Sequence, residues 1–207
     1  MLAEWEQRDL HRRAFDATYA WTWKDAMKRT AKDGGAGAMR GYYAEQANSW
    51  PRAAYRMVYT DNHDQNAWDD VASVVYGDAY PAAIALSFVG SGMPLIHNGQ
   101  EADLAHKLAF FDKDAIVWKQ GEHAGLFRKL VALKTRQRAL WNGEHGAPMV
   151  EVPSNATEHV YAFTRGAAGE RVFAVFNLSP EPREVSFTLA RHHGAYRDAL
   201  TDAPMTF

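Results

Sequence analysis

The feature of this sequence that most constrains its fold is a change of pattern near residue 140. Before that point, runs of β-forming residues alternate with helical patterns, which predicts βα units and a parallel sheet. The predicted strands lie at 14–19, 55–59 and 92–97, and the predicted helices at 22–32, 36–49, 79–88 and 123–138. In the last helix, leucines at helical spacing are predicted to face the core: Leu126, Leu130 and Leu133.

After Trp141 the sequence contains short apolar runs separated by Gly, Pro or Asn, a spacing typical of antiparallel hairpins. The predicted strands lie at 150–152, 160–163, 172–176 and 185–189, with a hairpin loop at 165–169. We therefore predict an α/β domain over residues 1–140 and an all-β domain over residues 141–207.

Composition limits the partners and cofactors. Of 207 residues, 47% are hydrophobic and 23% charged, as in ordinary globular proteins. The net charge is -2 and no long basic stretch occurs, so neither nucleic acid nor a membrane surface is an expected partner. Cysteine is absent, which excludes disulfides and cysteine-based sites, and no cofactor is expected. The most apolar run, 82–89, is too short to span a bilayer, and the N-terminus does not resemble a signal peptide, so the compartment is undetermined.

Polar clusters that carry a carboxylate follow the short apolar run at residues 1–3, also a predicted strand end, and the predicted strands at 55–59 and 92–97. They are Glu4, the triplet Asn62-His63-Asp64, and the pair Gln100-Glu101. In parallel α/β barrels, functional residues lie where strands run out into βα loops. Paired carboxylates in such a cleft suit glycosidic cleavage, because one protonates the leaving oxygen while another meets the developing positive charge.

Several segments resemble the α-amylase family of glycoside hydrolases. Residues 58–64, VYTDNHD, resemble the motif that closes the seventh barrel strand of that family, and residues 92–101, GMPLIHNGQE, resemble its eighth-strand segment. Residues 1–5, MLAEW, look like the end of the fifth strand, and residues 14–19, AFDATY, fit the sixth. The resemblance implies α/β architecture: a partial (β/α)8 TIM barrel, its C-terminal half, followed by a small antiparallel all-β domain that is incomplete.

The resemblance also implies roles for individual residues. Glu4 would be the general acid/base, Asp64 the transition-state stabiliser, and His63 a ligand of the same sugar. The implied substrate is an α-1,4-linked glucan, either maltodextrin or starch. The family's nucleophile, an Asp on the fourth strand, has no counterpart, since Arg197-Asp198 lies in the β region. The isolated chain is therefore expected to be inactive, with the N-terminal half of a barrel as a possible partner.

Each of these interpretations has a simpler alternative. Glu4 alone would be a solvated residue near a terminus, and His63 and Asp64 would cap a loop before a helix. The acidic run from Asp61 to Asp70 lacks the spacing and central glycine of a calcium loop, so no metal site is expected. The alternative function is a non-catalytic, amylase-like scaffold or a carbohydrate-binding protein.

Five further residues and one segment are considered. Gln100 and Glu101 are interpreted as structural, and His97 as a lining residue without a firm role. Trp5 and Trp68 are either sugar platforms or core residues. Residues 110–114, FFDKD, resemble a segment of family members that act on maltodextrins.

Overall fold

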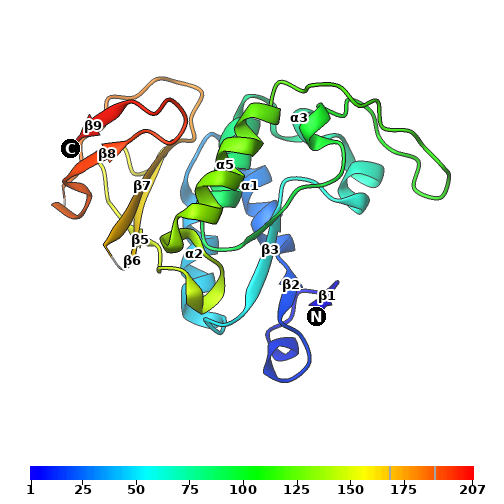
Figure 1. The fold of residues 1–207 in the computed structure, drawn as a ribbon, viewed down its shortest axis with the longest axis horizontal. Coiled ribbons are helices and arrows are strands. Elements are labelled where there is room, and N and C mark those ends of the chain that lie inside the picture. Colours follow the sequence, from blue (N-terminus) through cyan, green and yellow to red (C-terminus); the bar gives the residue numbers. More distant parts are fainter. Residues whose placement is uncertain (168, 189) are drawn as a thin grey trace.

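A sheet of four parallel strands forms the centre of the α/β region, in the order β1-β2-β3-β4 (Figure 1). The computed structural model describes residues 1–167, 169–188 and 190–207. The strands are β1 (Leu2–Ala3), β2 (Ala17–Tyr19), β3 (Tyr55–Tyr59) and β4 (Met93–Leu95). Each strand pairs in parallel with its neighbour. The strand and helix order is that of half a (β/α)8 barrel, as the sequence predicted.

Five α-helices accompany the sheet and the loops that follow it. They are α1 (Trp21–Asp33), α2 (Gly37–Ser49), α3 (Ala72–Tyr76), α4 (Tyr80–Val89) and α5 (Ala124–Arg136). Helix α1 ends at Asp33 and is followed by the capping residue Gly34, whose φ of 65° is the left-handed conformation that glycine adopts without a steric penalty. The predicted helices agree with these bounds to within about two residues, which is the usual uncertainty of helix ends. The single-turn α3 was not predicted.

Alternation along β3 separates two apolar clusters. Val58 packs in the main core among helices α1, α2 and α4. Its neighbours Met57 and Tyr59 point to the other face, where they pack with Tyr19 of β2. A strand places successive side chains on opposite faces, so this segment fills both layers at once. Leu130 is buried in the main core, and Leu126 and Leu133 pack against it, as predicted.

One helical stretch, residues 72–89, is long and apolar enough to cross a membrane by length and composition. This corrects the sequence-based expectation, in which the most apolar run, 82–89, was too short to span a bilayer. In the structure, 50% of the stretch is buried inside the fold, and Ile84, Leu86 and Phe88 lie in the core. A buried core helix meets the same length criterion as a membrane span.

The all-β region contains a three-stranded antiparallel sheet, β5-β6-β7, and a separate two-stranded one, β8-β9. The strands are β5 (Val150–Glu151), β6 (Val160–Ala167), β7 (Glu170–Asn177), β8 (Ala195–Arg197) and β9 (Pro204–Thr206). The predicted strand at 185–189 is wrong over 185–188, where Phe187 makes only an isolated bridge to Ser154, and Leu189 lies outside the described residues. The predicted loop at 165–169 is too long, because β6 continues to residue 167; Ala168 lies outside the described residues.

Two cations near the junction of the two regions are held by backbone carbonyls. Arg165 of β6 is 2% exposed and donates to the carbonyl oxygens of four residues: Trp141, Ala147, Val89 and Gly90. Lys134 of α5 donates to three more, those of Phe88, Gly92 and Leu140. Among the described residues, neither cation has a carboxylate partner. Backbone carbonyls at the end of α4 therefore fix the β region to the half-barrel. The domain boundary at residue 140 stays a prediction.

Candidate functional site

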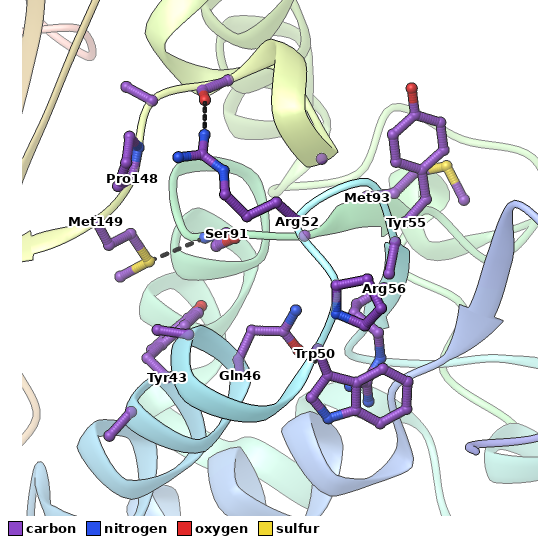
Figure 2. A pocket seen from close by; sticks show the side chains of 18 of the residues that line it. Tyr43, Gln46, Trp50, Arg52, Tyr55, Arg56, Ser91, Met93, Pro148 and Met149 are labelled. Atoms are coloured by element: carbon purple, nitrogen blue, oxygen red, sulfur yellow. Dashed lines mark hydrogen bonds between the residues drawn. The ribbon is translucent and has the colours of Figure 1, made fainter. Parts of the chain in front are cut away.

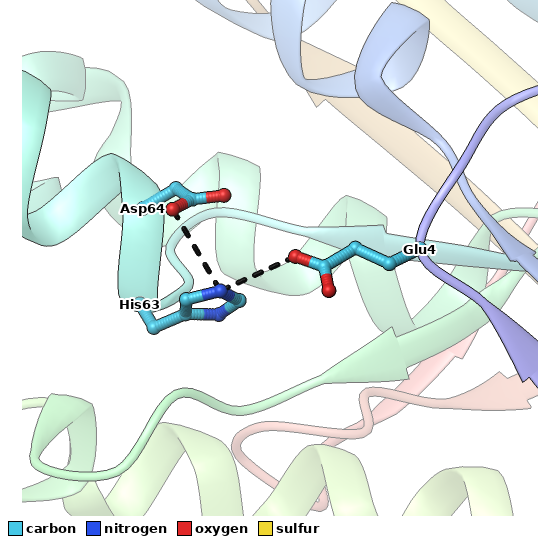
Figure 3. A group of neighbouring side chains, drawn as sticks. All are labelled: Glu4, His63 and Asp64. Carbon is cyan, nitrogen blue, oxygen red and sulfur yellow. Dashed lines mark ion pairs between the residues drawn. The ribbon is translucent and has the colours of Figure 1, made fainter.

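Glu4, His63 and Asp64 lie together at the carboxyl end of the sheet (Figure 3). His63 Nε2 is 3.3 Å from Glu4 Oε1 and 3.7 Å from Asp64 Oδ1. One side-chain ligand atom from each residue lies within 4.8 Å of those of the other two. The structure thus brings together all three residues that the sequence singled out.

Strand topology explains this convergence. Glu4 follows β1, and His63 and Asp64 follow β3 after the short turn Thr60–Asn62. Parallel strands all end at the same edge of a sheet, so side chains distant in sequence meet there. Strand β2 lies between β1 and β3 in the sheet, and Tyr19 is its last residue.

The three side chains are open to solvent. The exposed fractions are 57% for Glu4, 49% for His63 and 43% for Asp64. The loop-cap alternative is not supported for Asp64, because its side chain makes no cap hydrogen bond at the following turn, residues 65–69. A group that binds a ligand must remain accessible in this way, whereas a structural carboxylate is commonly paired or buried.

Glu6, only two residues away, has a different environment. Its carboxylate pairs with the buried guanidinium of Arg56 and accepts hydrogen bonds from Thr22 N at 2.9 Å and Thr22 Oγ1 at 2.6 Å. Glu6 is therefore committed to fixing β1 against α1 and β3. Of these two carboxylates, Glu4 is the one that points into the open site.

The floor of the site is a hydrogen-bonded polar network. His97 Nδ1 lies 3.3 Å from Asp61 Oδ2, and Asp61 is 3% exposed. Gln100 accepts from His97 N at 2.8 Å and donates to the hydroxyls of Thr60 and Tyr80, at 2.8 and 2.9 Å. These contacts give Gln100 the structural role that the sequence suggested. Glu101 likewise holds its own loop, since it accepts from Gly99 N at 3.1 Å.

The acidic run from Asp61 to Asp70 does not converge on one point. Asp61 is engaged with His97, Asp69 with Lys28, and Asp70 with the backbone N of Val71. Only Asp64 belongs to the cluster with Glu4. The expected absence of a metal in this protein stays a prediction.

Sequence reasoning missed two residues of the site. Tyr19 is 6% exposed; burial raises the pKa of its phenol, a hydrogen bond with Asn62 lowers it, and the negative charges of Glu4 and Asp64 raise it further. Asn66 is 1% exposed and accepts a hydrogen bond from Leu108 N at 2.8 Å, which anchors a distant loop. A polar residue following the Asn62-His63-Asp64 triplet was the available signal for Asn66, but only the fold showed its partner.

A cavity of about 370 Å³ lies away from this cluster, between α2, the start of β3 and residues 143–151 (Figure 2). Its polar groups mostly satisfy one another. Arg56 donates to Gln46 at 3.0 Å and lies 3.4 Å above the Trp50 ring, and Ser91 N donates to Met149 Sδ at 3.0 Å. This cavity therefore belongs to the junction of the two regions rather than to the carboxylate cluster.

Comparisons with known proteins give a family match for the β region and fold matches for nearly the whole chain. Residues 152–206 match the family of the C-terminal all-β domain of α-amylases. No curated protein sequence matches the chain. Among solved structures, the maltogenic α-amylase AmyB from Thermotoga neapolitana is similar with a TM-score of 0.81 at 21% identity, covering 99% of this chain and 48% of that one.

Two further α-amylase structures are similar. The enzyme from Lactobacillus plantarum has a TM-score of 0.75 at 24% identity, covering 98% of this chain and 46% of its own. The Anoxybacillus α-amylase has a TM-score of 0.73 at 14% identity, covering 99% and 47%. The chain thus spans about half the length of these three solved structures.

Proposed function

Because its fold and its C-terminal domain relate this chain to the α-amylase family, we propose that it supplies half of the active site of a retaining α-glucan hydrolase. In this proposal Glu4 is the general acid/base, Asp64 stabilises the transition state, and His63 binds the same sugar. The substrate class is α-1,4-linked glucan, maltodextrin or starch. The observation that carries the proposal is the convergence of these three accessible side chains at the carboxyl end of the parallel strands.

The chemistry assigns different tasks to the two carboxylates. A general acid must reach the leaving oxygen and give up its proton as the glycosidic bond breaks. Glu4 suits this task because it is accessible, whereas Glu6 is held by Arg56 and Thr22. Asp64 would then interact with the sugar at the cleavage point, where positive charge develops.

A nucleophile is still required for the retaining mechanism. The separation of Glu4 and Asp64 alone would suit a retaining pair, whose carboxyl groups are about 5 Å apart. His63 lies close to both carboxylates (Figure 3). In this proposal Glu4 and Asp64 are already assigned to proton transfer and charge stabilisation, so we infer that the nucleophile comes from residues other than those of this sequence.

The test is an assay of the purified chain on maltoheptaose. We expect no turnover, because nucleophilic attack and substrate positioning each supply several kcal/mol of barrier lowering. Turnover that Glu4→Gln abolishes would show the nucleophile argument to be wrong.

A second arm adds the N-terminal half of a similar α-amylase barrel in trans. Cleavage that requires both parts supports the proposal. A complemented barrel that binds maltoheptaose without cleaving it would instead favour the alternative, a non-catalytic carbohydrate-binding scaffold.

A further inference from the structure

An exposed group of aromatic side chains lies beside the carboxylate cluster. Trp68 is 63% exposed, Phe111 84% and Phe110 40%. Their ring centroids lie close together: Trp68 to Phe110 at 5.1 Å, Trp68 to Phe111 at 6.2 Å, and Phe110 to Phe111 at 4.8 Å. The core alternative for Trp68 is therefore wrong. Large apolar groups gathered on a surface commonly mark a binding site. We call these three residues the aromatic platform.

The loop that carries Phe110 and Phe111 is long and irregular. Between residues 103 and 123 it contains neither helix nor strand, and it extends outward from the body of the protein (Figure 1). Loops of this length without regular structure are uncommon in compact domains and are often functional. Trp68 comes from a different element, a π-helical turn at Gln65–Asp69. Such turns frequently occur at functional sites.

Local hydrogen bonds hold the loop in place. Leu108 N donates to Oδ1 of the buried Asn66, which ties the loop to the turn that carries Trp68. At the tip, Asp114 accepts from Ala109 N at 3.0 Å and from Ala115 N at 2.8 Å. These backbone donors hold the pKa of Asp114 below its usual value, so the tip is fixed by an ionised carboxylate near neutral pH. The platform is thus preorganised.

The platform is continuous with the proposed active site. The ring of Phe110 stacks on that of His63, with centroids 6.1 Å apart and planes inclined by 23°. The platform rings are inclined to one another by 45°, 66° and 84°, so they present faces in different directions. A curved, uncharged ligand with apolar faces on successive units suits such a surface, and a chain of α-linked pyranose rings has this chemistry.

We propose that Trp68, Phe110 and Phe111 bind pyranose rings of an α-glucan beyond the ring at His63, and thereby select longer chains. This inference rests on the proposed function, since it assigns an extended binding surface to that same site. Stacking of a sugar on an aromatic face uses the dispersion and burial that make aromatic rings effective contact surfaces.

Calorimetric titration of the full chain with maltotriose and with maltoheptaose tests the inference. We expect Trp68→Ala and Phe111→Ala to raise the Kd for maltoheptaose by about tenfold and to change that for maltotriose by less than about twofold. Trp118→Ala is the matched control, because Trp118 is 59% exposed on the same loop but is not one of the platform rings; we expect no change. Circular dichroism checks that each variant is folded.

The outcomes separate this inference from the proposed function. Binding of neither sugar to the chain would overturn the inference, whereas the assay with the N-terminal half-barrel added in trans decides the proposed function. Binding of both sugars with unchanged Kd in the platform variants would overturn the inference alone. If these variants instead lose self-association while sugar binding stays the same, the platform is a protein contact and the inference is overturned.

Discussion

Two groups of charged side chains in this protein have opposite environments. Glu4, His63 and Asp64 at the carboxyl end of the sheet are about half exposed and contact mainly one another. Arg165 and Lys134 at the junction with the β region are held by seven backbone hydrogen bonds to carbonyl oxygens. The first group is available to a ligand, and the second is already saturated by the protein.

The difference in environment separates charged side chains that serve function from those that serve stability. An exposed charge near water costs little to keep and contributes little to folding. A buried cation is tolerated only if its donors are satisfied, and its removal leaves buried acceptors without partners. Substitutions in the first group should therefore change chemistry with little effect on stability, and substitutions in the second should do the reverse.

The largest effect is expected at Glu4. In a barrel completed in trans, Glu4→Gln should lower kcat/KM for maltoheptaose by about 10³-fold or more, because the amide cannot donate the proton. The free energy of unfolding of the chain should change by less than about 0.5 kcal/mol, as is usual for an exposed position. Steady-state kinetics and calorimetry measure the two quantities. A loss of stability comparable to the loss of activity would break the comparison.

The next largest effect is expected at Arg165. Arg165→Met should destabilise the chain by about 3 kcal/mol, since the carbonyl oxygens of Gly90, at the end of α4, and of Ala147, before β5, lose a buried donor. Urea denaturation measures this change. Arg128→Met, at an exposed position on α5, is the control and should lie within about 0.5 kcal/mol of the unchanged chain. Equal effects of the two variants would contradict the assigned role of Arg165.

A smaller effect concerns pH and Lys134. Burial and, to a lesser extent, the nearby positive charge of Arg165 lower the pKa of Lys134 to about 7, while three carbonyl acceptors favour the ammonium form. Between about pH 7 and the unfolded pKa of 10.5, the unfolded chain binds more protons than the folded one. The Lys134 contribution to the free energy of unfolding should therefore rise with pH across this window.

The measurement is the free energy of unfolding at several pH values, for the unchanged chain and for Lys134→Met. The difference between the two curves isolates Lys134 from other titrating groups. A difference that stays constant from pH 7 to pH 10 would show that the carbonyls hold the ammonium form throughout. In that case burial would not change the protonation of Lys134 over this pH range.

The sequence predicted the α/β region more accurately than the β region. Apolar periodicity placed β3 at residues 55–59 without error, because its β-forming residues are bounded by a proline-containing turn and a polar cluster. The strand expected at 185–189 had a comparable pattern, yet over its described residues only Phe187 pairs. Strand pairing depends on non-local partners, which a local pattern does not contain.

For the candidate site, the sequence by itself determined which residues follow the strands, and hence that Glu4, His63 and Asp64 would share one edge of a parallel sheet. That inference works because strand direction alone decides the edge. Only the tertiary structure decided that Glu6 pairs with Arg56, and that the ring of Phe110 stacks on that of His63, which is distant from it in the sequence. Those outcomes depend on which side chains meet across separate elements, and the folded packing alone determines that.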